Sequence, residues 1–307
     1  MKFQLTLALL LIPLTGCIAD ESPEPVNKPE NGFVVTAILE SKKLDEVSGI
    51  QSGEGGVFFL HNDDGSPSIY IADTDGRHLG KIVIRDAKNR NWEDITRIPR
   101  ESGPLLVLGD IGDNKARYKS IKLYFVAEPR PSASGAYPEE VDLLHKVKVR
   151  YPDGPRDCEA MAYDPASNMI LFLSKRDQPP RLYGLPVEDA LQAGKSELQY
   201  LGDVPGFRPP TTADLLNSKK RGAYISQPTG MDISSDGTRA AVITYRSLYL
   251  FERAEGESWA DAFLKAPLEY IGPPGLHDEA VTFEFNALDV YVSTERRPTP
   301  VYKLELQ

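Results

Sequence analysis

Cysteine is scarce in this chain: only two occur among 307 residues, Cys17 near the N-terminus and Cys158 in the interior. Once Cys17 is assigned to a lipid anchor, as argued below, Cys158 has no partner for an internal disulfide. Stability must therefore come from packing, and Cys158 is expected to be a small buried hydrophobe. The four histidines show no cluster and indicate no particular chemistry.

Long hydrophobic runs are also missing. The apolar run Leu5–Leu14 is too short to cross a bilayer as a permanent helix. It follows Lys2 and leads into Leu14-Thr15-Gly16-Cys17, a pattern that predicts a signal peptide over residues 1–16. The segment resembles the bacterial lipobox, which implies cleavage before Cys17 and lipid attachment to its sulfur. An ordinary secreted protein with a chance cysteine is the alternative.

By analogy with lipoprotein sorting, Ile18 after the cysteine favours an outer membrane location facing the periplasm, if the cell is Gram-negative. Residues 17–32 are rich in proline, glutamate and asparagine, which predicts a flexible tether. Residues 33–307 show no break in composition long enough to divide them, so we expect one domain and a monomer. The membrane would be contacted only through the lipid.

Basic residues are outnumbered, with 35 lysines and arginines against 45 acidic residues and a net charge of −10. This balance argues against general nucleic-acid binding. Several catalytic motifs are absent as well: a glycine-rich phosphate loop, a Gly-x-Ser-x-Gly elbow and a His-Glu-x-x-His helix.

What the chain does contain is a repeat. Five predicted strands open with an oxygen-bearing residue followed by two small or apolar positions; the opening residues are Ser48, Glu93, Glu159, Thr229 and Glu279, the second with Asp94 next to it. After each opening come a second strand and then a third that carries an aliphatic–tyrosine pair: Ile69-Tyr70, Leu123-Tyr124, Leu182-Tyr183, Leu248-Tyr249 and Val301-Tyr302. Five matched units of four strands each predict an all-β, five-bladed β-propeller.

The last unit ends after its third strand, at residues 300–306, and so lacks a fourth. The apolar run Phe33–Leu39 precedes the first unit, and we expect it to complete the last blade and close the ring. A plain antiparallel sandwich is one alternative. A six-bladed propeller that uses Pro209–Tyr224 in an extra blade is the other.

In such a propeller the five opening residues converge around the central channel. Converging carboxylates repel one another, and a hard cation would relieve that repulsion. The set contains only oxygen donors, so it fits Ca²⁺ and disfavours zinc or copper. A water-filled channel without metal and a glycosidase acid–base pair among the carboxylates are the alternatives.

The second strands end at the same mouth and bring charged residues with them. We single out Asp63, Asp110, Lys175, Arg176, Arg246 and Arg296 as candidate catalytic or binding groups. Basic groups beside a cation suit an anionic ligand, phosphate or carboxylate. The long connection Gly206–Gln227 reaches the same face, either as a lid or as a surface excursion.

Several short motifs of the chain resemble those of the calcium-activated nucleotidase, or apyrase, family. The resemblance rests on Glu46-Val47-Ser48-Gly49-Ile50, Asn62-Asp63-Asp64-Gly65, Glu93, Leu108-Gly109-Asp110-Ile111-Gly112, Glu159-Ala160, Leu173-Ser174-Lys175-Arg176 and Ser293-Thr294-Glu295. It implies a five-bladed propeller with calcium held in the channel by Ser48, Glu93, Glu159, Thr229 and Glu279, Thr229 replacing a family serine. The chain departs from the family at the rim, where the family's lysine and tryptophan near Asp113 and its paired arginines in the third blade are missing.

The leading functional hypothesis is a calcium-dependent hydrolase of a phosphate-containing substrate. Asp63 or Asp110 would act as general base, and the basic groups would stabilise the negative charge that develops. The second hypothesis is a non-catalytic binding lipoprotein that holds an anionic small molecule or an envelope component, with a structural calcium. A glycoside hydrolase is the third.

Overall fold

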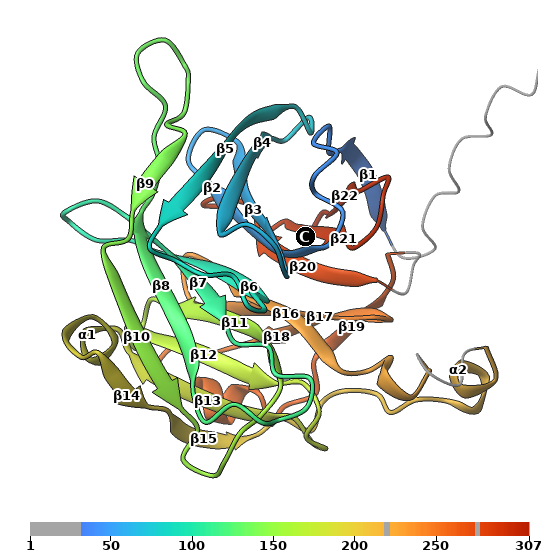
Figure 1. Ribbon diagram of the computed structural model, residues 1–307. Helices are drawn as coiled ribbons and strands as arrows, with labels where there is room; N and C mark the ends of the chain where they lie inside the picture. Colours follow the sequence, from blue (N-terminus) through green and yellow to red (C-terminus); the bar gives the residue numbers. More distant parts are fainter. Residues whose placement is uncertain (1–31, 218–221, 274–276, 307) are drawn as a thin grey trace, which may run out of the picture.

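The computed structural model describes residues 32–217, 222–273 and 277–306, and its strands form five antiparallel-based sheets around a common centre (Figure 1). The five-bladed β-propeller prediction is confirmed. Apolar runs separated by turn residues explain the strands, because the strands nearest the channel are buried by neighbouring blades on both faces of their sheets. The sandwich and six-bladed alternatives are wrong.

The strands of each blade are given in order from the channel outward. Blade 1 consists of β2 (Val47–Gly53), β3 (Val57–Asn62), β4 (Ser68–Asp73) and β5 (His78–Arg85). Blade 2 consists of β6 (Asp94–Ile98), β7 (Leu105–Asp110), β8 (Ile121–Ala127) and β10 (His145–Arg150). Blade 3 consists of β11 (Cys158–Asp164), β12 (Met169–Ser174), β13 (Arg181–Pro186) and β15 (Gln199–Asp203).

Blade 4 consists of β16 (Pro228–Ile233), β17 (Arg239–Thr244), β18 (Ser247–Glu252) and β19 (Leu268–Ile271). Blade 5 consists of β20 (Asp278–Phe283), β21 (Val290–Thr294), β22 (Pro300–Leu304) and β1 (Phe33–Ile38). β1 pairs antiparallel with β22, and Phe33 lies opposite Leu304 with its side chain fully buried. The N-terminal strand therefore closes the ring, as predicted.

Blades 1 and 2 contain one strand more than the sequence predicted. β9 (Glu140–Asp142) pairs parallel with β5, and β14 (Lys195–Glu197) pairs parallel with β10. Each added strand comes from a connection further along the chain, so it covers the outer edge of one blade and ties that blade to the next. The prediction of four strands in every blade is wrong for these two, because short exposed strands show no apolar alternation.

The segment proposed for a sixth blade is helical where it is described. It contains α2 (Thr212–Asn217) and a 3₁₀ turn (Gly222–Tyr224), and α2 extends away from the sheets (Figure 1). The remaining helices, α1 (Val187–Gln192) and α3 (Trp259–Ala262), are short connections in blades 3 and 4.

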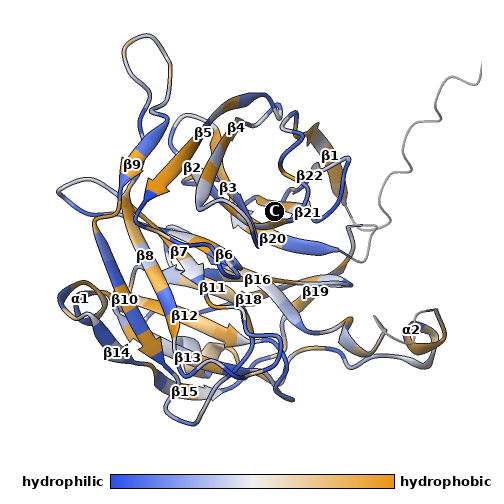
Figure 2. Cartoon of the chain, viewed as in Figure 1, coloured by the Kyte–Doolittle hydropathy of each residue, from blue (hydrophilic) through white to orange (hydrophobic). Residues whose placement is uncertain are grey.

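The core lies between the blades. The five aliphatic–tyrosine pairs all fall in third strands, and their aliphatic members are fully buried. Hydrophobic residues accordingly gather on strands such as β5 and β12, whereas the connecting loops are mainly hydrophilic (Figure 2). Cys158 is buried as expected, and burial raises the pKa of its thiol to about 12, so it is unreactive at neutral pH.

The signal peptide (1–16), the lipidation site Cys17 and nearly all of the tether (17–32) lie outside the described residues. Within the described ranges, none of the helices is long and apolar enough to span a bilayer.

Candidate functional site

The five opening residues share one structural position. We call the end of the channel where the inner strands begin the upper mouth, and the end where they finish the lower mouth. In blades 1, 3, 4 and 5 the pairing of the first two strands skips the opening residue, which makes it the extra residue of a bulge. Glu93 directly precedes β6. All five side chains are buried at the upper mouth: Ser48, Glu93, Glu159, Thr229 and Glu279, the ring residues.

The ring contains an internal cation. The Lys175 ammonium, only 4% exposed, forms an ion pair with the Glu159 carboxylate and donates to the Tyr245 hydroxyl at 3.0 Å. Tyr245 in turn donates to Glu279 Oε1 at 2.7 Å. Two ring glutamates are thus joined through a lysine and a tyrosine from the ends of β12 and β17.

The third glutamate lies on the other side of the ring. The Ser48 hydroxyl donates to Glu93 Oε2 at 2.9 Å, and the Asn91 side-chain amide also contacts this carboxylate. The Thr229 hydroxyl donates to the Asp278 carbonyl at 2.7 Å, so its hydrogen points to the backbone rather than to a glutamate.

The three ring glutamates influence one another's ionisation. Burial, followed by the charges of Glu159 and Glu279, raises the pKa of Glu93 well above its usual value. Burial and the charge of Glu159 do the same to Glu279. The pKa of Glu159 is raised by burial even though Lys175 opposes the shift. Burial alone would lower the pKa of Lys175, but Glu159 and its neighbours raise it well above the usual range, so it stays charged.

A second group of carboxylates lies beside the upper mouth, at the ends of β2 and β3 in blade 1. One oxygen from each of Glu46, Asp63 and Asp64 lies within 4.8 Å of the others. Burial and the charges of Glu46, Asp64 and Glu295 raise the pKa of Asp63 to about 7. Glu295 connects this group to the ring, because it also lies against Glu279 and raises the pKa of that carboxyl. Glu295 therefore lies near both Asp63 and the ring residue Glu279.

Asp94 lies between the ring and the lower mouth on the inner strand of blade 2. Its Oδ2 accepts hydrogen bonds from the backbone of Met161 in blade 3 (2.8 Å) and of Met231 in blade 4 (3.2 Å), although it belongs to blade 2. Its Oδ1 accepts from Ile95 at 2.9 Å. Its carboxylate therefore links the inner strands of blades 2, 3 and 4 next to the ring residue Glu93.

The structure distinguishes the two candidate bases. Asp110 is fully buried and forms ion pairs with Arg90 (3.3 Å) and Lys122 (2.8 Å), which occupy both of its oxygens. Asp63 is half-buried, and its Oδ1 has no hydrogen-bond partner among the described residues. Of the two, Asp63 is the one placed to accept a proton.

The candidate basic residues have different surroundings. Arg176 forms an ion pair with Asp157 at 2.6 Å and keeps about a third of its side chain exposed (35%). Arg246 is buried and bonds Asp214 at 2.7 Å, so it anchors the connection that contains α2. Arg296 is exposed at the rim, in a left-handed backbone conformation with φ 77°. The four basic residues do not converge on one point.

The ring supplies the type of donor that a hard divalent cation prefers. Its side-chain donors are all oxygen apart from the Lys175 ammonium, and three buried glutamates face that single ammonium. The carboxylate oxygens of the three ring glutamates do not all lie within 4.8 Å of one another. Among the described residues, those of Glu46, Asp63 and Asp64 lie that close together.

Asp94, Tyr245 and Glu295 were not among the predicted catalytic or metal-binding residues, although Glu295 belongs to one of the motifs quoted above. A signal for Asp94 was available: the position after each opening residue is Gly49, Ala160, Gly230 and Ala280 in the other blades. Four small residues and one carboxylate at equivalent positions indicate a side chain that reaches into the space left by the others.

Comparisons with known proteins give only distant structural likenesses. No family model and no curated protein sequence matches the chain. Among solved structures it is similar to hydrazine synthase of Kuenenia stuttgartiensis, with 12% identity, a TM-score of 0.41, and coverage of 85% of this chain and 72% of that chain. It is also similar to a luciferin-regenerating enzyme, with 14% identity, a TM-score of 0.42, and coverage of 85% and 78%. Likeness at this level carries no argument about activity, and the resemblance to calcium-activated nucleotidases stays a prediction.

Proposed function

We propose that this protein binds Ca²⁺ at the ring and hydrolyses a phosphate-containing, anionic substrate at the upper mouth. The observation that carries the proposal is the series of carboxylates from Asp63 through Glu295 to the ring, where burial and then mutual repulsion raise the pKa values of Asp63, Glu93 and Glu279. An acidic mouth repels an anion by itself, so a bound divalent cation is what would make such a substrate acceptable there.

Ser48, Glu93, Glu159, Thr229 and Glu279 would hold the ion, which would polarise a phosphoryl oxygen. Asp63 would take the proton from an attacking water, because its pKa of about 7 matches a base that works near neutral pH. Arg176 and Arg296, the basic candidates with exposed side chains, would bind the phosphate. Lipid attachment at Cys17 would place this activity at the outer membrane, facing the periplasm.

Calcium binding is tested on a chain that begins at Lys28, ahead of β1. We expect about one calcium per chain, and at a hundredfold excess over Kd a stabilisation of about 2.7 kcal/mol, or roughly 5–10 °C in Tm. Glu93→Gln should abolish this shift without lowering Tm in chelator, because it also removes a repelled carboxylate. Glu101→Gln, at an exposed site in the loop after β6, is the matched control. An unchanged calcium response in Glu93→Gln would place the ion elsewhere.

Asp63→Asn tests the assignment of the base. Removing a general base lowers kcat by about 10²–10⁴, so turnover of a hydrolysable phosphate ester should fall by at least a hundredfold. Asp64→Asn makes the same charge change at an exposed neighbour and should leave kcat within about threefold. Equal losses in both variants would show that only the total charge of the mouth matters.

A non-catalytic binding protein with a structural calcium is the second candidate. It is favoured by one observation: Lys175 and Arg246 are already engaged in buried ion pairs and are not available to a substrate. A panel of phosphate monoesters, diesters and nucleotides separates the two candidates. Calcium-dependent turnover of any of them establishes the hydrolase, whereas calcium-dependent affinity without turnover establishes the binding protein.

A further inference from the structure

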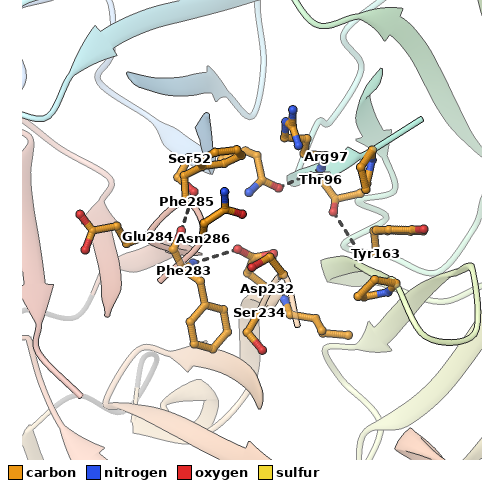
Figure 3. Close-up of a pocket in the computed structure, with 15 residues that line it drawn as sticks. Ser52, Thr96, Arg97, Tyr163, Asp232, Ser234, Phe283, Glu284, Phe285 and Asn286 are labelled. Atoms are coloured by element: carbon orange, nitrogen blue, oxygen red, sulfur yellow. Dashed lines mark hydrogen bonds between the residues drawn. The ribbon is translucent and has the colours of Figure 1, made fainter. Parts of the chain in front are cut away.

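The lower mouth contains a cavity of about 220 Å³ that the function proposed above does not use. It lies where the inner strands end, and residues from all five blades line it (Figure 3). Along the inner strand of blade 2, Asp94 lies between the ring residue Glu93 and the cavity residue Thr96, and its carboxylate bonds to the inner strands of blades 3 and 4.

In four of the five blades, the side chain three positions after the opening residue accepts a hydrogen bond from the next blade at this level. Gln51 accepts the Arg97 N–H at 2.9 Å and Thr96 accepts the Tyr163 N–H at 3.0 Å. Asp232 accepts the Phe283 N–H at 2.9 Å, and Thr282 accepts the Ser52 N–H at 3.0 Å. Each bond joins one inner strand to the next.

The equivalent residue in blade 3 is Ala162, which cannot accept a hydrogen bond. The Ile233 N–H that would pair with it donates instead to Oδ1 of the adjacent Asp232, at 2.9 Å. The hydrogen bonds that join successive inner strands are therefore interrupted between blades 3 and 4. The carboxylate of Asp232 lies beside this interruption.

The charge of Asp232 is not needed for this architecture. Glutamine and threonine, both neutral, make the same bond in blades 1, 2 and 5. In the described part of the chain no lysine or arginine forms an ion pair with Asp232, and Arg97, which also lines the cavity, is paired with Glu128. The cavity thus contains a buried carboxylate without a cation.

The rest of the lining is mixed. Phe285 and Phe283 contribute aromatic surface (Figure 3), Pro99, Pro165 and Ile233 contribute apolar surface, and the remainder is polar, including Glu284, which is paired with Lys303. The Arg97 guanidinium lies 5.1 Å from the centre of the Phe285 ring, which shows that this ring accepts a cation at its face. A carboxylate beside aromatic walls is the arrangement that binds an organic ammonium group.

We propose that the lower cavity is a binding site for a small organic amine, with its ammonium on Asp232 and its apolar part against Phe285 and Phe283. The inference is independent of calcium and of phosphate chemistry, because it concerns the opposite mouth. Neutral molecules of the same shape should bind poorly, since they leave the Asp232 carboxylate without a counter-charge.

The test is a titration of the calcium-free chain with benzylamine, monitored by ligand-observed NMR. Benzyl alcohol serves as the uncharged control ligand of the same shape. We expect benzylamine to bind at least tenfold more tightly than benzyl alcohol. Asp232→Thr, which introduces the residue that blades 2 and 5 carry here, should weaken benzylamine binding at least tenfold. Phe285→Ala should weaken it without touching the carboxylate, and keeps the test valid if Asp232→Thr fails to fold.

Three results would overturn the proposal. Equal affinity for benzylamine and benzyl alcohol would remove the role of charge. Benzylamine binding that is unchanged in Asp232→Thr or in Phe285→Ala would place the amine elsewhere. Binding of CaCl₂ that depends on Asp232, with no amine binding, would make the cavity an inorganic cation site.

Discussion

Asp94→Ala is expected to be the most damaging single substitution at the channel. Alanine fits the space, since Ala160 and Ala280 occupy equivalent positions, but it leaves the N–H groups of Met161 and Met231 without their acceptor. Each buried donor that loses its partner costs about 1–3 kcal/mol. Together with the bond from Ile95, we expect a loss of about 3–5 kcal/mol of unfolding free energy, or roughly 10 °C in Tm.

Asp94→Asn is the matched variant. Its side-chain carbonyl can still accept from Met161 and Met231, whereas its amide faces the Ile95 N–H, so we expect less than half of the loss seen with alanine. Denaturant unfolding monitored by circular dichroism measures both. If Asp94→Ala is as stable as the wild-type chain, the contacts between blades 2, 3 and 4 do not depend on this carboxylate.

The repeat made most of the fold predictable from the sequence. Five opening residues and five aliphatic–tyrosine pairs recur in register, because each blade repeats the same contacts with its neighbours. The closure by Phe33–Leu39 followed from the short last unit. By contrast, β9 and β14 pair at blade edges through three exposed residues each, and such short segments leave no periodic pattern to detect.

The position of the ring was predictable for the same reason, but its electrostatics were not. Lys175 and Arg246 both follow a second strand and look alike in the sequence. One reaches into the ring and pairs with Glu159, while the other turns outward to Asp214 on α2. Which carboxylate a basic side chain meets depends on loops such as 206–227, whose course the repeat does not determine.

The buried carboxyls predict an unusual pH dependence of stability. Burial raises the pKa of Asp232 to about 6 and, with three neighbouring carboxylates, that of Asp63 to about 7. Glu93 and Glu279 are raised as well, and so is Asp278, which is fully buried with both oxygens lacking a hydrogen-bond partner in the described residues. In the unfolded chain these groups titrate near pH 4.

A raised native pKa means that the folded protein binds more protons than the unfolded chain between pH 4 and the native pKa. Stability must then fall as pH rises through this window. For Asp232 alone, a shift from 3.8 to about 6 corresponds to about 3 kcal/mol, present at low pH and lost by about pH 7. Carboxyls with lowered pKa, such as Asp164 and Glu269, act in the opposite sense, but only below about pH 4.

We therefore expect Tm in chelator to be several degrees higher at pH 5 than at pH 8. Saturating calcium should reduce this difference, because an ion at the ring stabilises the charged forms of Glu93, Glu159 and Glu279. It should not affect the part that comes from Asp232, which lies below Asp94 at the other mouth. A Tm that is flat or rises from pH 5 to pH 8 in chelator would contradict the raised pKa values, and a calcium effect that is equal in Glu93→Gln would contradict the ring as its origin.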